Sequence, residues 1–198
     1  MTDVPGLILA GGRSSRMGGG DKCLSPLHGR PLLSHILDRI QPQTSRLLIN
    51  SNSDRTLFGN FGLPVRPDTL PDHPGPLAGI LTGLLWAREH GATHLATVPC
   101  DTPFLPHDLV PRLEQGLCRS RAGIVVARDP ARIHPIIALW PIGLAPQLAA
   151  DLHAGARSVF RWLDQFAFCS VEFPADHFMN LNTPAELLAA ERASSLAA

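Results

Sequence analysis

The chain has 198 residues and carries 17 acidic and 17 basic side chains, so its formal net charge at pH 7 is zero. A chain of this length can bury one sizeable hydrophobic core, and we expect a single domain over residues 1–198. The charge balance provides no field that would attract nucleic acid or an anionic membrane, so we expect neither as a partner.

The N-terminal apolar run is too short for a signal peptide or a membrane span and has no basic leader. The four cysteines are widely spaced and form no C-x-x-C pair, which is typical of reduced thiols rather than of a disulfide framework or a zinc site. We therefore expect a cytoplasmic protein.

Short apolar runs alternate with amphipathic segments along the first two thirds of the chain. The predicted strands cover residues 7–10, 46–49, 63–66, 94–98 and 123–127. The predicted helices cover residues 31–40, 76–89 and 106–115. Strands that alternate with helices favour a mostly parallel sheet. We expect the α/β class, as a three-layer sandwich with a Rossmann-like sheet and helices on both faces.

Beyond Arg128 the pattern is less regular. Residues 133–140 predict a strand, antiparallel to 123–127 and joined to it by a turn at Asp129-Pro130. The segments that follow are helices near 143–153 and 158–165, a strand near 169–173 and a further segment at 178–181. The last helix begins after Thr183, which forms a capping box with Glu186.

A glycine-rich loop follows the first predicted strand in the stretch 7–22, LILAGGRSSRMGGGDK. Its glycines allow successive backbone N–H groups to point into one hollow, and Arg13, Arg16 and Lys22 add positive charge. This combination suits a triphosphate or another polyanion, but its spacing matches neither the Walker loop nor the dinucleotide fingerprint. Lys22 is the only lysine in the chain. A mobile point charge directly after a glycine-rich loop favours a contact with phosphate over the alternative that the only lysine stands there by chance.

Polar residues follow three other predicted strands, at Asn50, Asp68 and Asp101. Because ligands of such sheets bind beyond the carboxyl ends of the strands, these residues and the loop converge on one edge. Asp101 lies in a turn between two prolines, and its carboxylate is of the kind that binds Mg²⁺. The alternative is that Asp101 only caps its own turn. Asn50 and Asp68 are also typical turn residues. The helix that starts at Pro76 points free N–H groups at the same edge, which favours anions.

The motif L-A-G-G-x-x-x-R-M-G-x-x-D-K in this loop resembles the signature of the molybdenum cofactor guanylyltransferase family (MobA-like), which is more loosely related to sugar-phosphate nucleotidyltransferases. The segments P-G-P-L-A-G, P-C-D-T-P, H-P and N-L-N-T-P resemble the family as well, so the likeness covers residue 7 to about residue 187. It implies a nucleotide-diphospho-sugar transferase-like fold. It also implies a nucleotide-binding half at about 1–115 and an acceptor-binding half at about 116–198.

The resemblance implies transfer of GMP from GTP to the terminal phosphate of molybdenum-molybdopterin, with Mg²⁺ as cofactor and pyrophosphate as leaving group. Catalytic roles are implied for Asp101, Lys22 and Arg16, with Asp101 as the metal ligand. The implied nucleotide-binding residues are Leu9, Ala10, Gly11, Gly12, Lys22, Asn50, Asp68 and Asp101. The implied acceptor-binding residues are Gly79, His134, Asn180 and Asn182. Cofactor-delivering or molybdoenzyme-specific proteins are the implied protein partners.

Alternatives stay open at this point. The family often has an acidic residue directly before the His-Pro pair, where this chain has Ile133. His134 by itself is also typical of a hydrogen-bonded structural histidine, and Gly79 of close helix packing. The same chemistry with CTP or with a sugar phosphate is one rival, and a non-catalytic nucleotide sensor is another. The sensor is disfavoured by the retention of Asp101 and Lys22.

Overall fold

The computed structural model describes residues 3–11, 21–70, 75–120 and 122–195, with side chains to residue 192. Its centre is a seven-stranded sheet in the order β5-β4-β1-β6-β8-β7-β9. The strands are β1 (Gly6–Leu9), β4 (Leu47–Asn50), β5 (Val65–Arg66), β6 (His94–Pro99), β7 (Ile124–Arg128), β8 (Ile133–Pro141) and β9 (Phe168–Glu172). Only β8 runs antiparallel to its neighbours in this sheet, as predicted.

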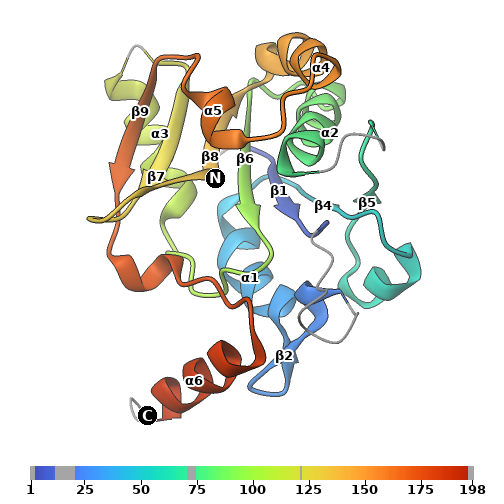
Figure 1. Ribbon diagram of the computed structural model, residues 1–198, viewed down its shortest axis with the longest axis vertical. Coiled ribbons are helices and arrows are strands. Elements are labelled where there is room, and N and C mark those ends of the chain that lie inside the picture. The colour runs from blue at the N-terminus through green and yellow to red at the C-terminus, as the bar shows by residue number, and fades with distance from the viewer. Residues whose placement is uncertain (1–2, 12–20, 71–74, 121, 196–198) are drawn as a thin grey trace.

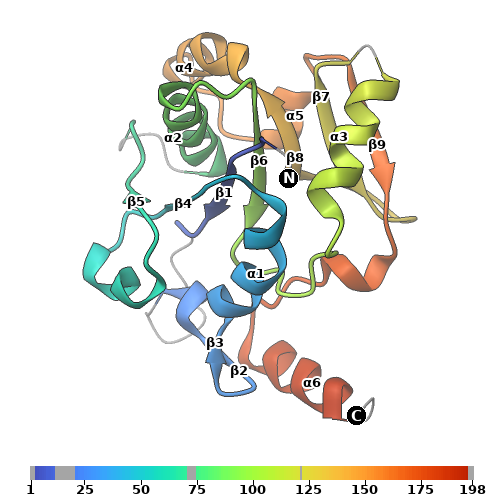
Figure 2. The same ribbon diagram turned by 180° about the vertical axis from the view of Figure 1, so that it is seen from behind.

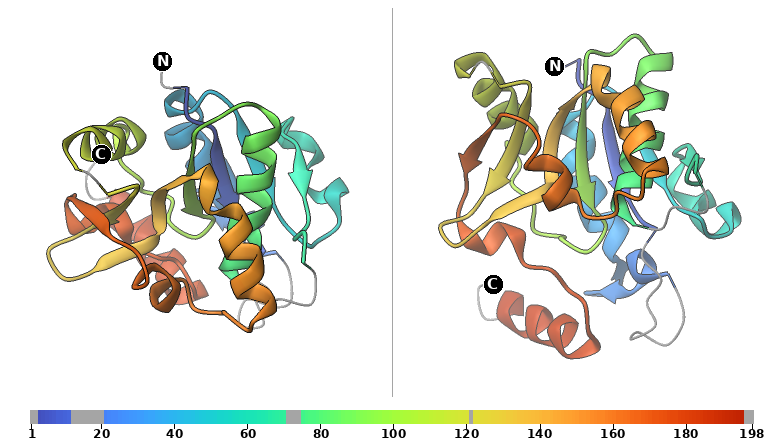
Figure 3. Two further views of the ribbon diagram at one scale, coloured as in Figure 1. Left: turned by 90° about the horizontal axis from the view of Figure 1, so that it is seen from above. Right: turned by 45° about the horizontal axis from the view of Figure 1, so that its top comes forward.

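Helices cover both faces of the sheet, which confirms the three-layer α/β architecture (Figures 1 and 2). One face carries α1 (Leu32–Ile40) and α3 (Leu109–Arg119). The other carries α2 (Pro76–Glu89), α4 (Ala145–His153) and α5 (Val159–Leu163). Seen from above in Figure 3, the sheet lies between these two layers.

Two separate hydrophobic clusters hold the layers together. Successive strand residues alternate between them: Ile8 belongs to the α1 and α3 cluster, whereas Leu7 belongs to the α2 and α4 cluster. All three side chains of Trp140, Trp162 and Leu7 are fully buried. Burial of each such side chain stabilises the fold by roughly 1.5–3 kcal/mol.

The carboxyl ends of β1, β4, β6, β7 and β9 meet at one edge of the sheet, because these strands are mutually parallel or separated by the antiparallel β8. In Figure 1 this edge is the lower end of the sheet. The final helix, α6 (Pro184–Ser195), lies beyond it, near the hairpin of β2 (Pro26–Leu27) and β3 (Arg30–Pro31). Leu27, Leu32, Leu181 and Leu187 form a third cluster between these parts.

The β2–β3 hairpin corrects one expectation, since Pro31 was expected to open the first helix. Pro31 instead has an extended backbone (φ −53°, ψ 143°) and pairs with Pro26, so α1 begins one residue later. The hairpin turns at His28 and Gly29, which have φ values of 49° and 72°. The His28 amide donates to Glu191 Oε1 of α6 at 2.8 Å, so the hairpin and α6 support each other.

Helix α3 differs from its predicted range of 106–115. Its start is fixed by Gln43, whose Oε1 accepts from the amide of Val110 and whose Nε2 donates to the carbonyl of Pro106. Gly116 does not end the helix. A Cβ there would lie 2.7 Å from Cγ2 of Val171, so the glycine lets β9 pack closely against α3.

The remaining helical segments are single turns or short 3-10 helices: η1 (Lys22–Leu24), η2 (Gln41–Gln43), η3 (Arg55–Phe61), η4 (Ile142–Leu144) and η5 (Ala175–Phe178). Both α4 and α5 are shorter than their predicted ranges. None of the helices in the described part of the chain is both long enough and apolar enough to cross a membrane.

Candidate active site

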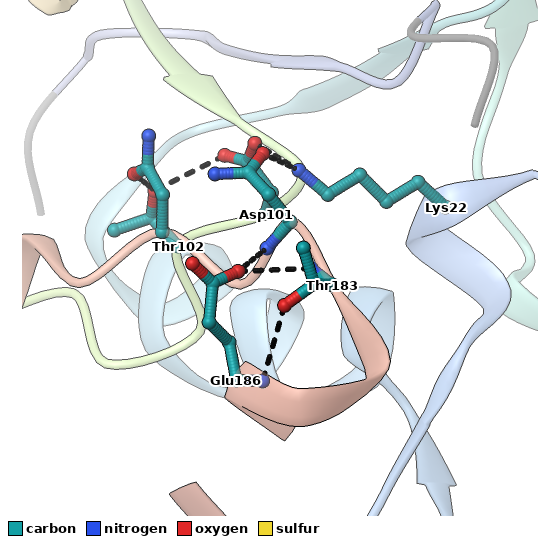
Figure 4. A network of polar contacts seen from close by, with 7 residues as sticks. Lys22, Asp101, Thr102, Thr183 and Glu186 are labelled. Carbon is teal, nitrogen blue, oxygen red and sulfur yellow. Dashed lines mark hydrogen bonds and ion pairs between the residues drawn. The ribbon is translucent and has the colours of Figure 1, made fainter. Parts of the chain in front are cut away.

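Lys22 and Asp101 meet at the carboxyl edge of the sheet. Asp101 lies two residues beyond the end of β6, and Lys22 is the first residue of η1. The Lys22 Nζ lies 2.5 Å from Asp101 Oδ2 and also donates to Asn182 Oδ1. The side chains of Lys22 and Asp101 are only 12% and 19% exposed, so water screens this ion pair less than a surface pair. Figure 4 shows the extended Lys22 side chain reaching Asp101.

Residues 178–182, here called the crossing segment, run from the last residue of η5 toward the start of α6 and pass beside Asp101. The amide of Leu181 donates to the carbonyl of Asp101 at 2.9 Å. The Thr102 Oγ1 donates to Asn180 Oδ1 at 2.9 Å. The predicted acceptor residues Asn180 and Asn182 therefore both lie against the loop that carries Asp101.

The capping box predicted at the start of α6 is confirmed, and it holds the end of the crossing segment (Figure 4). Glu186 Oε2 accepts from the amides of Asn182 at 2.6 Å and Thr183 at 2.8 Å. Thr183 Oγ1 accepts in return from the amide of Glu186 at 3.2 Å. The bond from the amide of Asn182, with those from Thr183, keeps the pKa of Glu186 below its ordinary value, so the carboxylate stays ionised.

A second group of polar residues lies at the ends of β4 and β5. Asn50 Nδ2 donates to Asp68 Oδ1 at 2.9 Å and to the carbonyl of Arg66 at 3.2 Å. Asp68 Oδ2 accepts from Asn52 Nδ2 at 2.8 Å, and the Asp68 amide donates to Asn52 Oδ1 at the same distance. The predicted nucleotide residues Asn50 and Asp68 are thus in direct contact. A cavity of about 660 Å³ opens beside Asp68 between η3, β5 and α2.

Gly79 brings the first turn of α2 against this group. A Cβ at this position would lie 2.2 Å from Asn50 Oδ1 and 2.5 Å from Leu9 Cδ2, which no real side chain allows. The glycine is required by this close approach. Gly79 lies beside Asn50, a predicted nucleotide residue, whereas the family resemblance implied a role for Gly79 in acceptor binding.

The start of the glycine-rich loop is fixed by backbone bonds at the end of β1. The Ala10 amide donates to the carbonyl of Asn50 at 2.8 Å, and the Leu9 carbonyl accepts from the amide of Cys100 at 3.1 Å. Gly11 is exposed. Gly12 and Arg16, with the rest of the loop to residue 20, lie outside the described residues.

Two buried thiols are adjacent in sequence to the ion pair: Cys23 follows Lys22, and Cys100 precedes Asp101. A hydrogen bond with Cys23 and burial raise the pKa of Cys100 well above its ordinary value. Cys100 is therefore a protonated, packed thiol, as expected from the sequence, and not an activated nucleophile. All four cysteines are free.

His134, at the start of β8, forms a buried pair with Asp129. Its Nε2 lies 2.8 Å from Asp129 Oδ2, and each side chain is 9% exposed. Asp129 Oδ1 accepts from the amides of Ala131 and Arg132. The bond to His134, followed by these turn amides, lowers the pKa of Asp129 to about 2. Asp129 was predicted only as a turn residue, and the proximity of an acid to the His-Pro pair was the available signal.

The described residues contain no group of three or more histidine, cysteine or acidic side chains that could enclose a metal ion. A magnesium ion requires no such group, because it is often held by one or two carboxylates, water and phosphate oxygens. The Asp101 carboxylate at this edge already contacts a cation, the Lys22 ammonium.

An α/β/α sandwich with a Lys–Asp ion pair at the carboxyl edge of its mostly parallel sheet has the architecture of the class of nucleotide-binding α/β proteins. Comparison with known families narrows this class. The model of the MobA-like NTP transferase domain matches residues 6–166, and the chain belongs to this family.

Individual relatives agree with this assignment. The chain is 45% identical over 195 residues to a molybdenum cofactor guanylyltransferase of Rhodopseudomonas palustris (strain BisB5), covering 96% of this chain and 93% of that protein. It is 46% identical over 186 residues to one of Yersinia pseudotuberculosis serotype O:1b (strain IP 31758), covering 93% of each. The solved structure of molybdopterin-guanine dinucleotide biosynthesis protein A from Archaeoglobus fulgidus has the same fold, with a TM-score of 0.77, 20% identity and coverage of 98% and 100%.

Proposed function

We propose that the protein transfers GMP from GTP to the terminal phosphate of molybdenum-molybdopterin, releasing pyrophosphate and forming the guanine dinucleotide cofactor. The observation that supports nucleotidyl transfer best is the contact of Lys22 with Asp101 and Asn182 at the sheet edge. The choice of GTP and of the pterin acceptor is supported by the relatives that carry this activity in their names.

Magnesium fits the carboxylate of Asp101. Asp101 Oδ2 and Asn182 Oδ1 both face the Lys22 ammonium, so this position already accommodates positive charge. Both atoms are oxygens, which Mg²⁺ prefers as ligands. We propose that Asp101 holds the ion, which when bound supplies positive charge against the triphosphate.

The chain's own residues would mainly position the substrates and balance charge. Lys22 exchanges its contact with Asp101 for a contact with the triphosphate, and Arg16 of the glycine-rich loop provides a second cation. The backbone of Leu9, Ala10, Gly11 and Gly12 and the N-terminus of α2 face the nucleotide. Asn50 and Asp68 contact its base or ribose. These roles define a nucleotide-binding half over about residues 1–115.

The acceptor would lie on the other side of the Lys22–Asp101 pair, against residues of about 116–198. Asn180 and Asn182 of the crossing segment orient its terminal phosphate for in-line attack on the α-phosphorus of GTP. His134 supports this side, and Gly79 lets the start of α2 approach Asn50 and Leu9 closely. An ionised phosphate is already a nucleophile, so the reaction needs no general base.

The test is release of pyrophosphate from GTP and from CTP, with and without molybdenum-loaded molybdopterin and with and without Mg²⁺. We expect release only when GTP, acceptor and metal are all present, and its loss in Asp101→Asn. Release with CTP instead would make the protein a cytidylyltransferase. Binding of nucleotide without release under any condition would replace the proposal by a nucleotide sensor.

A further inference from the structure

The crossing segment is anchored at its start by an aromatic cluster far from Asp101 in the sequence. Phe178, the first residue of the segment, is 2% exposed. Its ring centroid lies 4.5 Å from that of His134 and 5.6 Å from that of Phe173. Asn180 and Asn182 follow within four residues, so the position of Phe178 constrains where their side chains reach Thr102 and Lys22.

The orientation of the His134 ring depends on Asp129. The carboxylate of Asp129 joins three groups of the β7–β8 turn: the His134 ring through Oδ2, and the amides of Ala131 and Arg132 through Oδ1. Because the pKa of Asp129 is lowered to about 2, this carboxylate is ionised at neutral pH and His134 Nε2 donates to it. A charge-assisted bond between two side chains that are 9% exposed fixes the ring strongly.

Two other cations near this turn, Arg128 and Arg112, have partners of their own. Arg128 donates from Nε to the carbonyl of Asp129 at 3.3 Å and lies 3.5 Å from Glu172 Oε2. Arg112 stacks on the Phe173 ring at 4.1 Å and donates to the carbonyl of Glu172. The Asp129 carboxylate therefore bonds to the turn amides and to His134. The His134 ring in turn packs against Phe178, the first residue of the crossing segment.

We propose that Asp129 is a positioning residue for the acceptor side: through His134 and Phe178 it sets the place of Asn180 and Asn182 relative to Asp101. This inference rests on the proposed function, because it assigns those asparagines to the acceptor. It gives the buried acid–histidine pair a role beyond stability. Neither Asp129 nor His134 touches the reacting atoms in this scheme.

The first experiment measures amide hydrogen exchange at Leu181, whose N–H donates to the Asp101 carbonyl. We expect Asp129→Asn to speed exchange at Leu181 by about tenfold, because the ring of His134 loses its ionised partner. The matched control is Asp151→Asn, which removes a carboxylate that accepts from Trp162 Nε1 at 2.8 Å between α4 and α5. Unchanged exchange at Leu181 in Asp129→Asn, or an equal change in Asp151→Asn, would overturn the inference.

The second experiment compares the kinetics of the same variants in the complete reaction. We expect Asp129→Asn to raise KM for the acceptor by about tenfold while KM for GTP changes less than about twofold, and Phe178→Leu to change them in the same direction. Equal changes in both KM values would contradict the assignment. A wild-type protein that releases no pyrophosphate would overturn the proposed function, and the exchange experiment would still decide whether Asp129 positions the segment.

Discussion

The nucleotide side and the acceptor side of the candidate site are built in different ways. On the nucleotide side, Asn50 and Asp68 are 18 residues apart and lie at the ends of the neighbouring strands β4 and β5, so their contact results from the strand order itself. On the acceptor side, Asn180 meets Thr102 across 78 residues and Asn182 meets Lys22 across 160. The nucleotide side therefore forms together with the sheet. The acceptor side forms only when the crossing segment folds back across the sheet edge.

This difference predicts that the two sides respond separately to mutation, except at the ion pair that joins them. The loop after β1 provides Lys22, the loop after β6 provides Asp101, and the crossing segment provides Asn182. A change at the ion pair should damage the whole reaction. A change elsewhere should affect one substrate more than the other.

The largest expected effect is that of Lys22→Ala or Asp101→Asn. Each should lower turnover by at least about 100-fold, because each removes a charge that would stabilise the reacting phosphates. The double variant should be little worse than either single variant if the two residues act as a unit. Single-turnover pyrophosphate release measures all three, with the exposed Asp164→Asn as control. Near wild-type turnover in folded Lys22→Ala and Asp101→Asn would remove these residues from the mechanism.

An intermediate effect, limited to the nucleotide side, is expected for Gly79→Ala. The added Cβ would collide with Asn50 Oδ1 and Leu9 Cδ2, so the Asn50 side chain must shift and its bond to Asp68 should be disturbed. We expect GTP to bind about tenfold more weakly and the protein to lose roughly 1–3 kcal/mol of unfolding free energy. Calorimetric titration with GTP and thermal unfolding measure the two effects.

The control for this variant is Gly143→Ala, because a Cβ at Gly143 has no heavy atom within 4 Å. It should change neither GTP binding nor stability by a comparable amount. A Gly79→Ala protein that binds GTP normally but has lost affinity for the acceptor would reverse the assignment of the two sides.

The contrast between the sides also explains what the sequence could reveal. The position of these residues, Asn50, Asp68 and Asp101, at the edge of the sheet was predictable, because each comes after a predicted strand and parallel strands end at one edge. The contact of Asn182 with Lys22 joins residues 160 apart and depends on long-range packing, whereas the contact of Asp129 with His134 joins residues five apart and depends on the geometry of the β7–β8 turn. His134 pairs with Ala127 because the β7–β8 register shifts between Val126 and Ala127. The alternation of apolar and polar residues in the sequence does not predict such a shift.

The β2–β3 hairpin was missed for a related reason. Each of its strands has two residues, and its turn uses a left-handed backbone at a histidine, which is not a typical turn signal. The start of α6 was predictable, in contrast, because a capping box is a local pattern of one threonine and one glutamate. Local motifs were therefore recovered on both sides of the site, and only their placement in space required the structure.

The smallest expected effect is that of Thr183→Ala at this capping box. The variant loses the bond from the Glu186 amide to Thr183 Oγ1, which should cost about 1 kcal/mol of unfolding free energy. The Glu186 carboxylate still accepts from the amide of Asn182, so the crossing segment keeps its end contact and KM for the acceptor should rise less than about threefold. Denaturant unfolding and acceptor titration measure the two quantities.

The matched control is Ser158→Ala, which removes the equivalent cap of α5, where Ser158 Oγ accepts from the amide of Arg161 at 3.3 Å. Both variants should lose similar stability, because both remove one helix cap. Only Thr183→Ala should change KM for the acceptor at all, since α5 supplies none of the residues assigned to it. If Ser158→Ala raised that KM equally, general loosening of the fold would explain the effect. The acceptor side would then not depend specifically on how the crossing segment enters α6.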